Sequence, residues 1–295
     1  MSIAEIAPAR PARDPLEAQR RFAALAARDD ATISDAGRSR LLCGGERTER
    51  AVVLLHGLTN CPQQWVPFAE EAFARGTSVV IPRLPGHGAR DLRGLPLAKI
   101  TAGEVLATAN EAIDIACGLG GRVIVCGLSI GSALATWLTF RRDDVARNVA
   151  LVPFFGLRDL PLAVDEAIVA GLRALPNVFL PWDPRGKGGQ VPPYAYPCFA
   201  TRAFSAMLHV GIDAVRTSRA RAPQGELVLG LNAREPAVDN GLARELAGRM
   251  EHARPGSTRV VTWTDLPANH DIIDPTNALA RVDLVYPRVL AEIER

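Results

Sequence analysis

The sequence predicts one large α/β domain in which a mostly parallel sheet is covered by helices on both faces. Three observations predict this fold class. Short apolar runs that end at turn residues alternate with longer segments of helical spacing. The apolar runs are continuous, which is typical of strands that are buried on both faces. The chain has 295 residues, 48% of them hydrophobic, which is enough to build one large core.

The first part of the chain, residues 1–45, is expected to form a tail, a helix and a leading strand. Residues 1–14 are rich in Pro, Ala and charge, as loose termini often are. The segment "DPLEAQRRFAALAARD" then places Leu16, Phe22 and Leu25 among strong helix formers, which predicts a short helix.

Strands and helices alternate clearly over residues 46–155, which we assign to the core. The predicted strands are 51–57, 78–88 with a Pro/Gly loop at its end, 122–127 and 148–155. The predicted helices between them are 62–77, 101–121 and 132–142.

The alternation stops at residue 156 and resumes at residue 223. Residues 156–222 include the Pro/Gly-crowded stretch "LPNVFLPWDPRGKGGQVPPYAYPCF", so we expect a cap or lid inserted into the core. Residues 223–295 complete the core. They contain the predicted strands 225–231 and 258–264 and the predicted helices 240–250 and 276–295.

Ser129 lies at a sharp turn from a buried strand into a helix. It is flanked by Gly127 and Gly131 in "VIVCGLSIGSALATWL". A Gly-x-Ser-x-Gly turn in this context is the nucleophile elbow, in which a strained serine projects above the sheet edge. An ordinary Gly/Ser turn is the alternative interpretation.

A serine nucleophile needs a base, and the base is usually histidine. Among the five histidines, His270 follows the last predicted strand and so lies at the same sheet edge as the elbow. We therefore predict His270 as the base. His56 and His87 fit packing or loop roles, whereas His209 and His252 fall on predicted helices.

The acid of such a site is expected on the loop after the strand at 225–231. That loop, "NAREPAVDN", offers Glu235 and Asp239. Glu235 lies closer to the strand end and reaches back toward the histidine more readily, whereas Asp239 also suits a helix N-cap. We predict Glu235, with Asp239 as the alternative. Asp271 and Asp274 are expected in turn formation and helix capping.

The chain order of serine, acid and histidine resembles that of the α/β-hydrolase superfamily over about residues 50–295. The nearest similarity is to serine-aminopeptidase-like and monoglyceride-lipase-like carboxylesterases. It is carried by the elbow and by "LLHGLTNCPQQW", "VIPRLPGHG" and "NHDIIDP". The acid in those relatives is usually Asp, so Glu235 departs from the pattern.

This resemblance implies a cap between the sixth and seventh strands and a Ser-His-acid mechanism with an acyl-enzyme intermediate. It also implies that the backbone N–H groups of Leu58 and Ile130 form the oxyanion hole. It requires no cofactor and no metal. The expected partner is a small-molecule acyl ester, and the expected function is carboxylesterase or monoacylglycerol-lipase-like hydrolysis.

Two other classes of function remain open on the sequence. A peptidase, thioesterase or acyltransferase would use the same three residues, and a catalytically silent binding protein would keep only the scaffold. The cap carries an aromatic cluster that either lines an acyl pocket or packs the cap onto the sheet. Its members are Phe179, Trp182, Tyr194, Tyr196 and Phe199, and the aliphatic Leu180 lies among them in the sequence.

The composition indicates which classes of partner and which cellular compartment to expect. The chain has 34 basic and 32 acidic residues and a net charge of +2, so neither nucleic acid nor a membrane surface is an expected partner. No apolar run is long enough to span a membrane. The five widely spaced cysteines fit reduced thiols in the cytoplasm. The sequence does not predict the oligomeric state.

Overall fold

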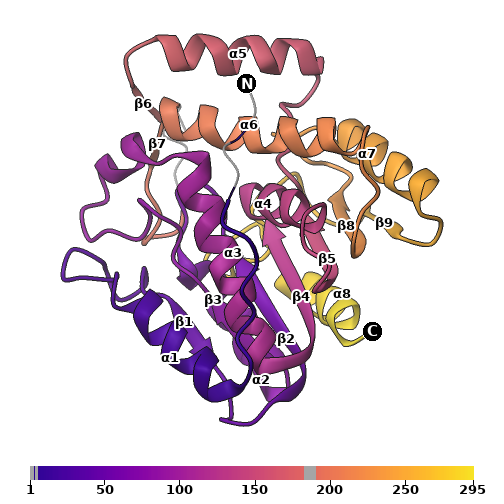
Figure 1. The fold of residues 1–295 in the computed structure, drawn as a ribbon. Helices are drawn as coiled ribbons and strands as arrows, with labels where there is room; N and C mark the ends of the chain where they lie inside the picture. The colour runs from indigo at the N-terminus through magenta and orange to yellow at the C-terminus, as the bar shows by residue number, and fades with distance from the viewer. Residues whose placement is uncertain (1–2, 4–5, 183–190) are drawn as a thin grey trace.

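The computed structural model describes the whole chain except residues 1–2, 4–5 and 183–190 (Figure 1). Within the described residues, a seven-stranded sheet has the order β1-β3-β2-β4-β5-β8-β9. Its strands are β1 (Arg40–Leu42), β2 (Thr48–Leu55), β3 (Ser78–Ile81), β4 (Gly120–Leu128), β5 (Val145–Leu151), β8 (Glu226–Asn232) and β9 (Thr258–Trp263). β1 pairs antiparallel with β3, and the other pairings are parallel. This is the predicted α/β architecture with a mostly parallel sheet.

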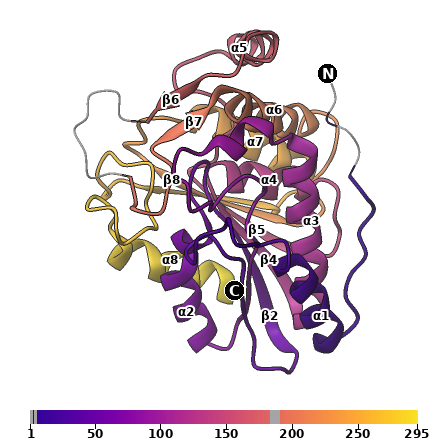
Figure 2. The same cartoon turned by 90° about the vertical axis from the view of Figure 1, so that its left-hand side faces the viewer.

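Helices cover both faces of the sheet, as the continuous apolar strands require. Figure 2 shows α2 and α8 on one side of the sheet and α3 on the other, with α1 packed outside α3. The helices are α1 (Pro15–Ala26), α2 (Val66–Ala74), α3 (Ala102–Leu119), α4 (Ile130–Thr139), α5 (Leu162–Ala174), α6 (Thr201–Thr217), α7 (Asn240–Ala253) and α8 (Val282–Glu294). Two 3₁₀ turns, η1 (Pro62–Trp65) and η2 (Leu95–Lys99), lie in the loops.

The helix boundaries follow local capping chemistry. α3 begins at a capping box in which Thr101 accepts a hydrogen bond from the backbone N–H of Glu104, and Glu104 accepts one from that of Thr101. α1 begins after Asp14, whose carboxylate accepts a hydrogen bond from the N–H of Glu17. Each cap satisfies backbone donors that a helix start otherwise leaves without a partner.

The last predicted helix, residues 276–295, is longer than the helix that forms. α8 begins only at Val282, because side chains occupy the backbone donors ahead of it. Asp274 accepts hydrogen bonds from the N–H and the hydroxyl of Thr276, and Asn277 accepts one from the N–H of Leu279. Short polar side chains of this kind favour turns over helix.

Two helices from the segment predicted as a cap, residues 156–222, lie in layers over α4. α6 packs on α4, and α5 packs on α6 as the outermost helix (Figure 1). A short antiparallel pair, β6 (Phe179–Pro181) and β7 (Cys198–Ala200), lies beside them, and residues 183–190 of the predicted cap lie outside the described part. α4 is buried along its whole length because the sheet lies on one side of it and α6 on the other.

The position of this insertion differs from what the resemblance implied. It lies between β5 and β8, which are the fifth and sixth strands of the main sheet in chain order, rather than between a sixth and a seventh. The count is one lower because, in the described part of the chain, the sheet starts with the three-residue strand β1 and no strand precedes it. The division into residues 1–45, 46–155 with 223–295, and 156–222 stays a prediction.

Candidate active site

Ser129 occupies a strained turn between β4 and α4. Its φ is 57° and its ψ is −112°, a left-handed backbone conformation that a residue with a side chain rarely adopts. The two flanking glycines make this turn possible for steric reasons. A Cβ on Gly127 would lie 2.2 Å from the carbonyl carbon of Gly131, and a Cβ on Gly131 would lie 2.1 Å from the carbonyl oxygen of Leu55.

Hydrogen bonds from the neighbouring strand hold the Ser129 backbone in this conformation. Its N–H donates to the carbonyl of Leu151 at 3.0 Å, and its carbonyl accepts from the N–H of Phe154 at 3.1 Å. The hydroxyl oxygen of Ser132 lies within hydrogen-bond distance of two carbonyl oxygens, those of Gly127 at 2.6 Å and Leu151 at 2.8 Å. The turn is therefore fixed from β4 and from the end of β5, which suits a preorganised side chain.

His270 contacts Glu235 directly. Its Nδ1 lies 2.9 Å from Glu235 Oε1, which also accepts from the N–H groups of Ala237 and Val238. Glu235 is buried, with 3% of its surface exposed, whereas 30% of the His270 side chain remains exposed. A buried carboxylate that is fixed by backbone donors orients the imidazole so that Nε2 stays free for chemistry.

The loop that carries His270 is attached to the end of β8. The side-chain amide of Asn232, the last residue of that strand, donates to the carbonyls of Pro267 and Asn269 at 2.8 and 2.9 Å. Because Glu235 follows the same strand by three residues, a single short segment positions both the acid and the histidine loop.

The other candidate acids have structural partners. Asp239 is the N-cap of α7, and its Oδ1 accepts from the N–H groups of Gly241 and Leu242 at 2.7 and 3.1 Å. Asp274 accepts from the Tyr194 hydroxyl at 2.6 Å and from Thr276. Asp271 accepts from backbone donors of its own loop and from Gln64. The sequence reasoning anticipated the turn contacts but not Gln64.

The pKa of His270 lies above its ordinary value of 6.5, as the net result of two opposing effects. Burial of the ring lowers the pKa, since it disfavours the imidazolium. The charge of Glu235 and its hydrogen bond raise it by more, and Asp271 adds to this. By contrast, burial lowers the pKa of His56 well below 6.5. His56 accepts from the N–H of Leu84 and is buried against His87, as expected for a packing role.

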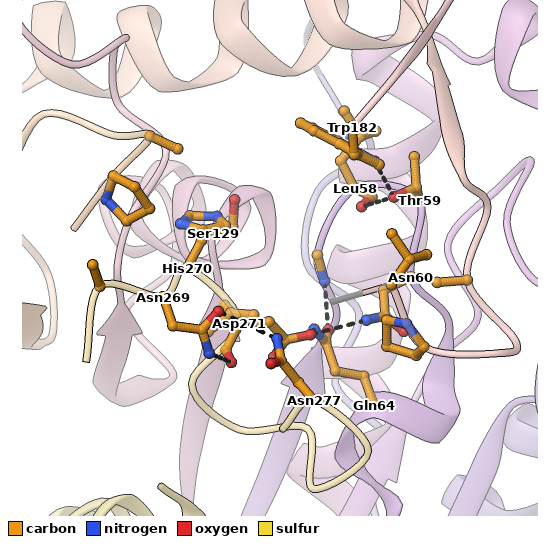
Figure 3. Close-up of a pocket in the computed structure, with 18 residues that line it drawn as sticks. Leu58, Thr59, Asn60, Gln64, Ser129, Trp182, Asn269, His270, Asp271 and Asn277 are labelled. Carbon is orange, nitrogen blue, oxygen red and sulfur yellow. Dashed lines mark hydrogen bonds between the residues drawn. The ribbon is translucent and has the colours of Figure 1, made fainter. Parts of the chain in front are cut away.

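Ser129 and His270 line the same cavity, which has a volume of about 260 Å³. In Figure 3 these two residues lie on one side of the view, Leu58, Thr59 and Trp182 lie on the other, and a group of polar side chains lies below. The polar group consists of Asn60, Gln64, Asn269, Asp271 and Asn277. The remaining lining is mostly apolar: Leu128, Val191, Pro192, Ala195, Pro236, Ala237 and Ala268, together with Gly57.

Within the described residues, no hydrogen bond joins the Ser129 hydroxyl to His270. Contacts of this kind are often long in a free enzyme and shorten only when substrate is bound. The oxyanion donors stay a prediction, of which the structure shows only the positions. Leu58 lines the cavity, and Ile130 is the first residue of α4, where the backbone N–H has no partner within the helix.

The aromatic cluster of the cap divides between the two predicted roles. Trp182 lines the cavity, and its indole N–H donates to the Thr59 hydroxyl at 2.7 Å. Phe199 packs behind the Trp182 ring at a centroid distance of 4.5 Å. Tyr196 is fully buried and bonds to the N–H of Ala89, so it anchors the cap to the core.

Sequence reasoning missed Gln64, which lies inside the quoted segment "LLHGLTNCPQQW". Its neighbour Gln63 has the same residue type, so only the three-dimensional contacts distinguish the two. In the part of the chain that is described, no three His, Cys, Asp or Glu side chains gather in a way that could hold a metal ion. The helices of that part are also too short or too polar to cross a membrane.

Comparisons with known proteins agree with the fold. The model of the Alpha/beta hydrolase family matches residues 52–289. A thermostable monoacylglycerol lipase from Bacillus sp. (strain H-257) is 30% identical over 121 residues, which are 41% of this chain and 44% of that protein. The matched region thus spans less than half the length of that curated relative.

Solved structures of low sequence identity share the fold. A structure from work on the metagenome-derived lipolytic enzymes LipS and LipT has a TM-score of 0.70 at 21% identity, covering 89% of this chain and 99% of that one. A soluble variant of the monoglyceride lipase from Saccharomyces cerevisiae has a TM-score of 0.69 at 10% identity, covering 87% and 90%. With a family model that matches most of its length, the chain belongs to the alpha/beta hydrolase family.

Proposed function

We propose that this protein is a serine hydrolase that cleaves carboxylic esters through Ser129, His270 and Glu235. The observation that carries the proposal is that His270, whose Nδ1 lies 2.9 Å from the buried Glu235, lines the same cavity as a serine in a strained elbow. The similarity to a monoacylglycerol lipase and to a lipolytic enzyme supports an ester as the substrate. The five cysteines are free thiols, which supports a cytoplasmic location.

The proposed reaction begins when Ser129 Oγ attacks the acyl carbonyl and His270 Nε2 takes its proton. Glu235 stabilises the resulting imidazolium. The backbone N–H groups of Leu58 and Ile130 donate hydrogen bonds that stabilise the negative charge on the carbonyl oxygen. His270 then protonates the leaving alcohol. A water molecule activated by the same imidazole releases the acid from Ser129, and no cofactor takes part.

A substrate panel tests the reaction class. We expect hydrolysis of short-chain carboxylic esters, measured against thioesters and aminoacyl amides with the same acyl group. Preference for the thioester or the amide would favour the thioesterase or peptidase alternative. Turnover of none of them, by folded protein, would favour a binding role.

Activity is expected to depend on acyl chain length. The cavity of about 260 Å³ lies below the usual range for ligand pockets, and Trp182, which lines it, is held in place by the Thr59 hydroxyl. We expect kcat/KM on p-nitrophenyl esters to be highest for short acyl groups and to fall as the chain lengthens. A profile that stays flat to very long chains would contradict a restricted acyl site.

The activity is also expected to fall at acid pH with the titration of His270. The neutral imidazole is the active form, so kcat/KM is lost as the pH falls through the pKa of His270. Because Glu235 raises that pKa, the midpoint of the acid limb is expected above 6.5. A pH series of initial rates measures it. A midpoint well below 6.5 would show that Glu235 does not act on the base as proposed.

A further inference from the structure

One side chain connects the two loops that carry the proposed oxyanion donor and the proposed base. Gln64, in η1, is 1% exposed and lies between the loop of residues 57–61 and the loop of residues 269–274. Its Oε1 accepts from the Gly57 N–H at 2.8 Å, and its Nε2 donates to Asp271 Oδ2 at 2.8 Å. In Figure 3 the side chains of Gln64 and Asp271 lie next to each other.

The acceptor at the far end of this bridge is itself fixed. Asp271 Oδ1 lies 3.4 and 3.2 Å from the N–H groups of Ile273 and Asp274, so the carboxylate follows its own loop. Asn60 adds a longer contact, 3.3 Å, to the same oxygen that Gln64 contacts. The Asp271 side chain therefore holds Gln64 in a fixed position relative to the loop that carries His270.

The chemistry of the neighbours determines which way the amide must point. A backbone N–H can only donate and an ionised carboxylate can only accept. A side chain that bridges them must offer an acceptor at one end and a donor at the other, as an amide does. A glutamate at position 64 would place two carboxylates in contact, and an apolar residue would leave the buried Gly57 N–H without this partner.

We propose that Gln64 and Asp271 are positioning residues that keep the Leu58 N–H aligned with His270 across the cavity. Leu58 follows Gly57 directly. A hydrogen bond that fixes the Gly57 N–H therefore also restrains the next peptide group, which carries the Leu58 N–H. The inference rests on the proposed function, because it assigns a role in the same reaction. Neither residue touches the reacting atoms in this account.

The pKa of Asp271 is raised, but it stays low enough for an ionised acceptor near neutral pH. Burial and the charge of Asp274 together raise the pKa of Asp271 to about 6. The Gln64 hydrogen bond, the Ile273 N–H and the charge of His270 oppose this effect. The bridge is therefore expected to weaken below about pH 6, where the carboxylate gains a proton.

Gln64→Leu removes both hydrogen bonds with little change in volume, and Gln63→Leu on the same turn is the matched control. We expect kcat/KM of Gln64→Leu on a short p-nitrophenyl ester to fall about 10- to 100-fold, mainly in kcat, because a small misplacement of a stabilising group is costly. Gln63→Leu should stay within about twofold of wild type. Thermal unfolding of each variant shows whether the protein is folded at the assay temperature.

A second pair of variants, at Asp271, distinguishes a hydrogen-bonded bridge from an effect of the Asp271 charge. This pair also tests the proposal if Gln64→Leu does not fold. Asp271→Ala removes the acceptor, whereas Asp271→Asn keeps a side-chain oxygen for the Gln64 amide but loses the charge. A positioning role predicts that Asp271→Asn recovers most of the activity that Asp271→Ala loses. It also predicts that adding Gln64→Leu to Asp271→Ala causes little further loss.

Three results would overturn the bridge. They are full activity of folded Gln64→Leu, losses that multiply in the double variant, and equal losses in Asp271→Asn and Asp271→Ala. Ser129→Ala is assayed beside them. If Ser129→Ala keeps its activity, the proposed function fails; if it is inactive while Gln64→Leu is fully active, only the bridge fails.

Discussion

Ser129→Ala is expected to lose about 10⁴-fold or more in kcat on a short-chain ester. The variant lacks the oxygen that would form the acyl-enzyme, so the reaction is left with the residual catalysis of binding and the oxyanion donors. Initial rates with p-nitrophenyl acetate measure the loss, and circular dichroism reports whether the variant is folded. Alanine is expected to fold at this turn, although the positive φ of residue 129 remains strained.

Ser205→Ala is a matched control for that experiment. Ser205 is fully buried on α6, and its hydroxyl donates to the carbonyl of Val169 at 3.2 Å, away from the cavity. Its loss should lower stability slightly and leave kcat nearly unchanged. Comparable losses in both serine variants would mean that Ser129 acts through stability and not as the nucleophile.

Glu235→Ala is expected to reduce kcat by about 10⁴-fold while KM changes little. Without the carboxylate, His270 loses the acceptor at Nδ1 that fixes its tautomer and stabilises the imidazolium. Steady-state kinetics at a pH above the acid limb measure the effect. Removal of the carboxylate should also lower the pKa of His270, so the acid limb of the residual activity should move to lower pH.

Asp239→Ala distinguishes the two acids that the sequence left open. Asp239 caps α7 through Gly241 and Leu242, so its loss is expected to cost about 0.5–2 kcal/mol in the free energy of unfolding and little in kcat. Chemical denaturation and steady-state rates measure the two effects. If kcat falls sharply in Asp239→Ala and is retained in Glu235→Ala, Asp239 and not Glu235 is the acid of the site.

The sequence predicts most of the fold because its signals are local. The central strands contain continuous apolar runs, such as residues 51–55 in β2 and 123–126 in β4, and Gly57 marks the turn after β2. The end of the chain shows where such signals mislead. Helical spacing over residues 276–281 suggested a longer α8, but the hydrogen bonds of Asp274 and Asn277 hold that stretch in turns. The spacing of apolar residues does not show that side-chain hydrogen bonds compete with those of a helix.

The candidate site is predictable where a local motif exists and not where contacts join distant segments. Ser129 is marked by its two glycines, and His270 by its position after the last strand. Glu235 and Asp239 lie four residues apart on one loop, so only geometry distinguishes the carboxylate at His270 from the one at the helix start. Gln64 and Asp271 are 207 residues apart, and nothing in the local sequence of either indicates their contact.

Labelling of the folded protein with a fluorophosphonate probe tests the central claim most directly. The account predicts one covalent adduct by intact mass, assigned to Ser129 by peptide mapping and lost in Ser129→Ala. It also predicts slower labelling in Glu235→Ala, because the probe reacts only with a serine activated by an oriented base. Absence of an adduct on folded wild-type protein, or an adduct at a residue other than Ser129, would contradict it.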